Sequence, residues 1–223
     1  VHVGLVRREI PIMIVVSGVA ALMMGDGQIS RVDAVLLLAA FVGFNVLMYI
    51  TTMRDRQTGE LTDADLAEGE NGVQKISRGR EALWVVAGIA LLMLGARLTV
   101  DNAMIVARAL GVSELFIGLT LIAIGTSLPE LATSLVAALR KQNDIAVGNI
   151  VGSNIFNMLL ILGLTALVQP IPVSAEVIAF DAPLMVGFAL LTLLFARNQE
   201  VSRWEAGALL AGYITFTVVA FLR

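Results

Sequence analysis

Long apolar runs separated by short charged segments are the dominant pattern along this chain. The runs cover residues 10–24, 32–51, 82–97, 116–139, 145–168, 175–196 and 204–222. The third run continues in a more polar form toward Ala109. Because a helix needs roughly 20 mainly apolar residues to cross the hydrocarbon core of a bilayer, each run is a candidate span. The pattern therefore predicts an all-α, polytopic membrane protein with about seven transmembrane helices.

The composition agrees with a membrane protein and narrows its chemistry. Of the 223 residues, 58% are hydrophobic and 15% are charged, whereas soluble domains carry about 25% charge. The chain has no cysteine and its single histidine is His2, so thiolate catalysis, histidine-based catalysis and cysteine or histidine metal clusters lack their residues. No basic, aromatic-rich segment indicates nucleic-acid binding. We expect neither an enzyme nor a nucleic-acid-binding protein, and no resident cofactor.

A hydrophilic stretch between the second and third runs divides the chain into three parts. We predict two transmembrane helices in residues 1–52, a hydrophilic loop in residues 53–80, and five helices with the polar motifs in residues 81–223. Within the loop, Asp63 and Asp65 have the spacing that opens an EF-hand, but Glu68 and Gln74 occupy positions that require glycine and glutamate. A solvated linker is therefore the favoured interpretation.

Basic residues are distributed unevenly between the two ends of the predicted helices. If successive helices alternate in direction, one side of the membrane receives Arg7, Arg8, Arg54, Arg56, Lys75, Arg78, Arg80, Arg140, Lys141, Arg197 and Arg203. The other side receives only Arg31, Arg97, Arg108 and Arg223. Because cytoplasmic loops carry the excess of Lys and Arg, we expect the long loop in the cytoplasm and the C-terminus outside.

The fourth apolar run contains the polar residues that most need an explanation. Glu130 lies in the middle of this run, where a charged side chain costs roughly 2.5–3.5 kcal/mol. Pro129 removes a backbone donor, so a carbonyl about one turn earlier loses its helical partner. Thr126 and Ser127 add two hydroxyl groups. Hard oxygen ligands concentrated at a helix interruption are typical of a Na⁺ or Ca²⁺ site.

The following run begins with a second set of polar residues, at helical spacing. A polar stripe is formed by Asn149, Ser153 and Asn157, which are four residues apart. Gly148 and Gly152 form a parallel stripe of small residues, which permits close approach of a neighbouring helix. Because only a short turn separates this helix from the preceding one, the two are expected to be antiparallel neighbours. Facing the stripes would bring Glu130 close to the last two members of the polar stripe.

Other polar residues in these helices have simpler interpretations. Asn149 by itself is more typical of helix packing than of ion binding. Thr133 and Ser134 are expected to hydrogen-bond back to their own helix. A hydrolase nucleophile elbow is disfavoured, because Pro129 stands where its second glycine should be and no catalytic histidine is present.

Two further acidic residues lie near predicted helix ends, where a charge reaches the interface at small cost. Arg97 and Asp101 are four residues apart and are expected to pair across one helical turn. Asp181 lies close to Pro183. Neither aspartate has a cluster of hydroxyls beside it, so we interpret both as structural.

At the polar motifs the sequence resembles the sodium/calcium exchanger family of the cation/Ca²⁺ antiporter superfamily. Residues 125–130 look like the family's GTSxPE motif and residues 148–154 look like its GNxxGSN motif, with matching spacing. The resemblance is to the second of the family's two α-repeats. It implies a fold of roughly ten helices in two inverted repeats, with the exchange site at the membrane midplane between them.

The resemblance also implies a set of oxygen ligands for the transported ions. These would be supplied by Ala123, Thr126, Ser127, Glu130, Ser153 and Asn157. Glu130 would be the acidic ligand shared by Ca²⁺ and Na⁺, Ala123 would offer a backbone carbonyl, and Ser153 would bind Na⁺ from the neighbouring helix. Asn157 is a neutral amide at a position where many members carry an acidic residue, which leaves the stoichiometry and ion preference open.

Only one copy of each motif occurs in the chain. We therefore expect that the family's first three helices, with their own repeat and glutamate, are absent from it. A single glutamate is a poor cage for Ca²⁺, which prefers six to eight oxygen ligands and usually more than one carboxylate. The other half of the site is expected from the same full-length protein or from a partner chain.

These observations predict an antiporter of a bacterial inner membrane that exchanges Ca²⁺ for Na⁺, or for H⁺ or K⁺. The expected mechanism is alternating access, with this chain supplying one half of the ion site. Two alternatives stay open: a cation/proton antiporter that uses Glu130 as its proton carrier, and a truncated membrane fragment that is not competent for transport.

Overall fold

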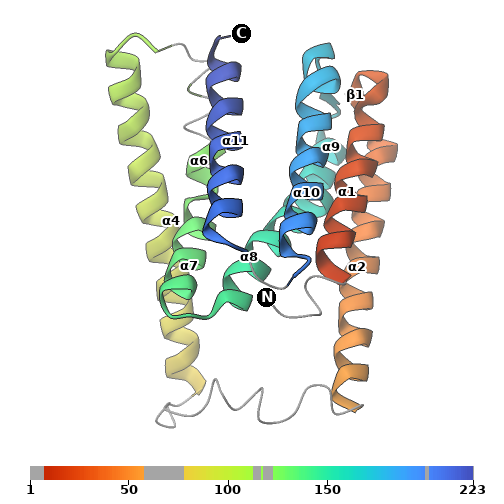
Figure 1. Ribbon diagram of the computed structural model, residues 1–223, viewed down its shortest axis with the longest axis vertical. Coiled ribbons are helices and arrows are strands. Elements are labelled where there is room, and N and C mark those ends of the chain that lie inside the picture. Colours follow the sequence, from red (N-terminus) through yellow and green to blue (C-terminus); the bar gives the residue numbers. More distant parts are fainter. Residues whose placement is uncertain (1–7, 58–77, 113–116, 118–122, 199–200, 223) are drawn as a thin grey trace.

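The computed structural model describes residues 8–57, 78–112, 117, 123–198 and 201–222, and these residues are almost entirely helical (Figure 1). The EF-hand-like residues 63–74, and most of the predicted hydrophilic loop, lie outside the described residues. The same holds for part of the stretch that precedes the GTSxPE-like motif.

The chain begins with a helical hairpin. α1 (Ile10–Met23) leads through the short 3₁₀ turn η2 (Met24–Asp26) and β1 (Gln28–Ile29) into α2 (Arg31–Gln57). Pro11 lies in the first turn of α1, where its missing N–H is not needed. Between η2 and β1, Gly27 has a φ of 88°, a left-handed conformation that glycine adopts without strain.

A capping box starts α2. The backbone N–H of Ser30 donates to Asp33 Oδ2 at 2.8 Å, and the backbone N–H of Asp33 donates back to Ser30 Oγ at 3.3 Å. Two otherwise unpaired donors of the first helical turn are thereby satisfied. Asp33 therefore lies at the start of α2, and Ser30 and Asp33 together stabilise the turn into this helix.

The second part of the chain contains the remaining elements. In order, they are α4 (Arg78–Ala109), α6 (Ala123–Thr126), α7 (Leu128–Leu139), α8 (Asn143–Phe156), the π-helical turn η4 (Asn157–Ile161), α9 (Leu162–Val168), β2 (Ile171–Pro172), the π-helical turn η5 (Val177–Asp181), α10 (Ala182–Ala196) and α11 (Arg203–Leu222). The predicted extension of the third apolar run to Ala109 is confirmed. At 32 residues, α4 is longer than the hydrocarbon core of a bilayer requires.

Successive helices run in alternating directions when α6–α7 and α8–α9 are each counted as one helical segment (Figure 1). β1 and β2 form an antiparallel pair in which Gln28 faces Pro172 and Ile29 faces Ile171. This pair places the α1–α2 turn and the α9–α10 connection at the same end of the molecule. The α7–α8 turn lies toward the opposite end (Figure 1). The arrangement agrees with the alternation assumed for the distribution of basic residues.

Several helices have the dimensions of membrane spans. In the described part of the chain, four helices are long and apolar enough to cross a bilayer, namely Arg31–Arg54, Gly79–Ala109, Asn143–Val168 and Val177–Ala196. The apolar helices Ile10–Asp26 and Leu128–Leu139 are shorter. Large apolar side chains such as Trp84 and Leu91 of α4 are each 69% exposed, as suits a lipid-facing or partner-facing surface. The all-α, polytopic membrane fold is confirmed, while the total of about seven spans stays a prediction.

The main apolar core lies between α1, α2, α8–α9 and α10. Its buried members are Ile10, Met13, Val16, Ile29, Ala34, Leu37, Val151, Ile155, Leu159, Ala166, Ala189 and Ala196. Among the described residues, none of these belongs to α4, α6, α7 or α11. α7 packs on α8, and α4 packs on α6 and α7. The polar motifs therefore lie at the edge of the core, where the layer of α4, α6 and α7 meets α8.

The helix that runs from α8 through α9 contains a π-helical turn. The backbone is helical from Asn143 to Val168 without interruption, and it widens at η4, which begins at Asn157. Single π-helical turns inside α-helices are frequent at functional sites. The turn places a predicted ligand residue at the one irregular point of this long helix, which periodicity alone did not indicate.

Candidate functional site

The helix that carries the GTSxPE-like motif is broken at Ser127. α6 ends at Thr126 and α7 begins at Leu128, and Ser127 between them has φ −95° and ψ 3°. Pro129 lies in the first turn of α7 and has no N–H to donate to the Gly125 carbonyl one turn earlier. The predicted interruption is confirmed, and it deprives this carbonyl oxygen of its usual α-helical donor.

Glu130 lies in the first turn of α7, where the helix dipole favours a negative charge. Its side chain is half-buried, and its Oε2 atom is buried without a hydrogen-bond partner among the described residues. The pocket in which it lies has a volume of about 210 Å³ and is lined by Ile89, Leu92, Met93, Pro129, Glu130, Thr133 and Asn149. A buried carboxylate oxygen without a partner is costly, so this position favours a bound cation or a proton.

Asn149 of α8 fastens its helix to α7. Its Nδ2 atom donates to the backbone carbonyl of Glu130 at 3.0 Å, and it lies 2.9 Å from both Thr133 Oγ1 and Ser134 Oγ. The Glu130 backbone is therefore tied to α8 by a side chain that also lines its pocket. The sequence interpretation of Asn149 as a packing residue is correct as far as it goes, but it missed this direct contact with the acidic residue.

The two hydroxyl residues that follow Glu130 behave differently from each other. Thr133 Oγ1 lies 3.0 Å from the carbonyl oxygens of both Pro129 and Glu130, as predicted for a bond to its own helix. The prediction was wrong for Ser134, whose Oγ donates across the interface to the Ala146 carbonyl of α8 at 3.3 Å. Ser134 is buried against α8, where partners are available on both sides of its hydroxyl.

A second pocket adjoins the first along α4. It has a volume of about 300 Å³ and is lined by Met93, Ala96, Arg97, Val100, Asp101, Gly125, Thr126 and Pro129. Met93 and Pro129 line both pockets. Thr126 thus faces the second pocket, one helical turn from Glu130 in the first. Ser127 is exposed at the helix break, and Ala123, predicted to offer a carbonyl, begins α6.

The predicted approach of Glu130 to Ser153 and Asn157 is not seen as direct contact. Among the described residues, no hydrogen bond joins Glu130 to either side chain, and Ser153 Oγ donates to the Ile150 carbonyl at 3.0 Å. The polar stripe meets α7 through its first member, Asn149. Ser153 and Asn157 lie one and two turns further along this helix and line neither of the two pockets described above.

A close helix contact occurs at Gly125, whereas Gly152, one of the two glycines expected to allow close approach, has open space beside it among the described residues. A Cβ atom added at Gly152 would meet no atom within 4 Å in the described part of the chain, so the described helices make no tight contact there. A Cβ added at Gly125 would instead overlap the side chain of Val100 on α4. The absence of a side chain at Gly125 therefore lets the short helix α6 lie directly against α4.

The site combines one carboxylate with neutral oxygen groups. In the part of the chain that the structure describes, no cluster of three or more His, Asp or Glu side chains could hold a metal ion. Glu130 is accompanied by hydroxyl, amide and backbone carbonyl oxygens at an interrupted helix. Interrupted helices with such oxygens are typical of midplane ion sites in secondary transporters. Fold and site together define a polytopic membrane transporter.

Comparison with known proteins agrees with this class. The family model described as sodium/calcium exchanger protein matches residues 81–222. The chain is 37% identical over 228 residues to the inner membrane protein YrbG of Escherichia coli (strain K12), covering 99% of this chain and 68% of that protein. It is 38% identical over 143 residues to the sodium/calcium exchanger MaX1 of Methanosarcina acetivorans, covering 64% of this chain and 41% of that one.

A solved structure shares the fold over the whole chain. The sodium-calcium exchanger NCX_Mj, soaked with 2.5 mM Na⁺ and 0.1 mM Sr²⁺, aligns with a TM-score of 0.72 and 32% sequence identity, covering 100% of this chain and 67% of that one. The chain belongs to the sodium/calcium exchanger family. It is an integral membrane protein of the cation/Ca²⁺ antiporter class, and the resemblance noted at its two motifs is confirmed.

Proposed function

We propose that this chain supplies one half of the ion site of an antiporter that exchanges Ca²⁺ for Na⁺ by alternating access. Glu130 is the acidic ligand, and Thr126, Ser127, Ser153, Asn157 and the Ala123 carbonyl complete this half of the site. No covalent chemistry and no resident cofactor are part of the proposal. The remaining oxygen ligands come from a first α-repeat, in the same full-length protein or in a partner chain.

The observation that carries the proposal is the buried Oε2 atom of Glu130, which has no hydrogen-bond partner among the described residues. At membrane depth such an oxygen needs a cation or a proton. The helix break beside it adds the Gly125 carbonyl, which Pro129 leaves without its usual donor. A single carboxylate with neutral oxygens is incomplete for Ca²⁺, which supports a second half rather than a self-contained site.

The mechanism follows from the competition of cations for one carboxylate. A bound Ca²⁺, or Na⁺ ions in its place, neutralises Glu130 and removes the cost of moving an uncompensated charge past apolar helices. The loaded site then closes to one side of the membrane and opens to the other. We further propose that the protein lies in a bacterial inner membrane, with the long loop in the cytoplasm and the C-terminus outside.

Glu130→Gln in the complete gene product tests this function. The neutral amide keeps the shape of the side chain but removes the charge, so Na⁺-driven ⁴⁵Ca²⁺ uptake into membrane vesicles should fall to background. Glu176→Gln is the matched control, because Glu176 is exposed and lies outside both pockets. Normal Ca²⁺ uptake by the Glu130 variant would refute the assignment.

A proton-coupled exchanger is the second candidate, because a buried carboxylate can carry a proton as well as a cation. It predicts that an imposed pH gradient drives Ca²⁺ uptake in Na⁺-free buffer. Under the Na⁺-coupled proposal, that uptake should be absent and should appear only when a Na⁺ gradient is supplied. If the complete gene product takes up no Ca²⁺ under either gradient, both antiport proposals fail. The third interpretation, a membrane protein that is truncated and not competent for transport, is then favoured.

A further inference from the structure

The second pocket contains a carboxylate that the proposed ion site does not use. Asp101 of α4 lines this pocket together with Thr126, and Arg97 lines it one turn away on the same helix. Met93 and Pro129 separate this pocket from the one that holds Glu130 and belong to both. The two pockets therefore adjoin along α4 and together are called the groove: Asp101 and Thr126 line its outer pocket, and Glu130 lines its inner pocket.

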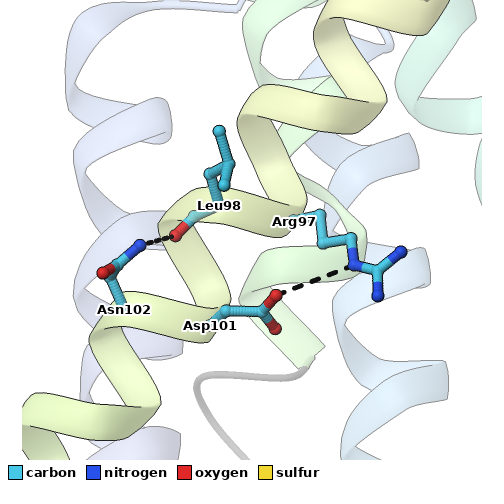
Figure 2. A network of polar contacts seen from close by, with 4 residues as sticks. All are labelled: Arg97, Leu98, Asp101 and Asn102. Carbon is cyan, nitrogen blue, oxygen red and sulfur yellow. Dashed lines mark hydrogen bonds and ion pairs between the residues drawn. The ribbon is translucent and has the colours of Figure 1, made fainter.

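The ion pair at the open end of the groove is a weak one. Arg97 Nε lies 3.7 Å from Asp101 Oδ2, and the two side chains are 82% and 51% exposed. Figure 2 shows both side chains on the same side of α4, while Asn102 turns away and donates to the Leu98 carbonyl at 2.7 Å. A single long contact between exposed groups contributes little to stability, so another cation can displace the guanidinium at little cost.

We propose that Asp101 is an outer binding position for the transported cation on its way to Glu130, and that Arg97 is the built-in competitor for that position. The proposal rests on the function proposed above, because it concerns access to the same site. A hydrated Ca²⁺ ion that approaches the groove replaces the Arg97 side chain at the Asp101 carboxylate. Its next oxygen ligands along the groove are at Thr126, beside the helix break.

This arrangement has a consequence that a purely structural ion pair lacks. A carboxylate at the mouth of a groove raises the local concentration of cations and the rate of their arrival, whereas the neighbouring guanidinium opposes both effects. Removal of each charge should therefore shift the apparent KM for Ca²⁺ in opposite directions. The turnover number should change little, because neither group belongs to the midplane site.

The experiment measures initial rates of ⁴⁵Ca²⁺ uptake into vesicles that contain the complete gene product, at low and at high ionic strength. Asp101→Asn should raise the KM for Ca²⁺ by about three- to tenfold at low salt, with kcat changed by less than about twofold. Arg97→Gln should lower the KM, and Asp101→Glu should restore it. The difference between Asp101→Asn and the unsubstituted protein should shrink at high salt, because screening weakens the attraction.

The controls separate this inference from the function on which it rests. If Glu130→Gln abolishes uptake but Asp101→Asn leaves the KM and its salt dependence unchanged, the outer binding position is refuted and the proposed function stands. A fall in kcat at unchanged KM would refute it as well. If the unsubstituted protein shows no Ca²⁺ uptake, or Glu130→Gln retains it, both proposals fail. Glu176→Gln, an exposed carboxylate outside both pockets, should behave as unsubstituted protein.

Discussion

Asn149 joins α8 to three oxygen atoms of α7 through one amide nitrogen, and one of these oxygens is the carbonyl of Glu130. The side chain thus fixes the backbone from which the carboxylate projects. Glu130 itself has no such support at Oε2 among the described residues. At the scale of residues, the site consists of a firmly held backbone and a carboxylate oxygen that is left for a ligand.

Asn149→Ala should weaken this arrangement. The change leaves the buried Ser134 hydroxyl, the exposed Thr133 hydroxyl and the Glu130 carbonyl without their shared donor, which costs about 1–3 kcal/mol for an interface of this kind. We expect a lower thermal midpoint in detergent and a raised KM for Ca²⁺, both measured on the complete gene product. Asn45→Ala is the control, since in the described part of the chain the Asn45 amide donates only to the Phe41 carbonyl of its own helix, at 2.8 Å. Equal effects of the two substitutions would argue against a positioning role.

Ser153→Ala tests a proposed ligand whose side chain has no hydrogen bond to Glu130 among the described residues. Its hydroxyl donates to the Ile150 carbonyl, and its oxygen lone pairs can still bind Na⁺. Loss of one neutral ligand should raise the Na⁺ concentration needed for half-maximal Ca²⁺ exchange by about fivefold, as expected for roughly 1 kcal/mol. The measurement is the Na⁺ dependence of ⁴⁵Ca²⁺ efflux from vesicles. An unchanged dependence would remove Ser153 from the set of ligands.

At the scale of elements, the short helix α6 owes its position to a glycine. Gly125 faces Val100 of α4 at a distance that leaves no room for a Cβ atom. Val100 is β-branched and has one strongly preferred rotamer in a helix, so it cannot easily yield. Gly125 and Val100 both line the second pocket, and their contact holds the Thr126 end of the broken helix against α4.

Gly125→Ala should therefore force α6 away from α4. Overpacking of this kind costs about 1–3 kcal/mol, so the thermal midpoint of the purified protein should fall and Ca²⁺ transport should decrease. Gly88→Ala on α4 is the matched control, because a Cβ at Gly88 would meet no atom within 4 Å in the described chain. There the gain in helix propensity should leave stability equal or slightly higher. A Gly125 variant as stable and active as the Gly88 variant would contradict the packing argument.

At the scale of the whole molecule, the paired strands β1 and β2 place two connections at one end, with the α7–α8 turn toward the other (Figure 1). Because the chain contains no cysteine, single cysteines can report the orientation without a background. Gln142 and Gln169 are both exposed and lie at these opposite ends.

Gln169→Cys should react with a membrane-impermeant maleimide added to intact spheroplasts, whereas Gln142→Cys should react only after permeabilisation. This result follows from the excess of basic residues expected on the cytoplasmic side. Labelling in the reverse pattern would invert the orientation, and labelling of both positions from the outside would contradict the alternation of helices.

The sequence by itself determined the class of the fold and the position of the acidic residue. The hydropathy pattern of each helix depends on its own residues, so the helices can be predicted one at a time from the sequence. The interruption at Pro129 also follows from one residue's missing N–H. The motifs at residues 125–130 and 148–154 accordingly led to the correct family before any contact was known.

Only the tertiary structure decided which polar groups meet. Whether Ser134 bonds to its own helix or to Ala146, and whether Gly125 or Gly152 lies in a tight helix contact, depends on the register and separation of two helices. The same register placed Asn149, rather than Ser153 or Asn157, against Glu130. Helical periodicity defines the face on which a residue lies, but the partner of that face is set by packing between elements far apart in the chain.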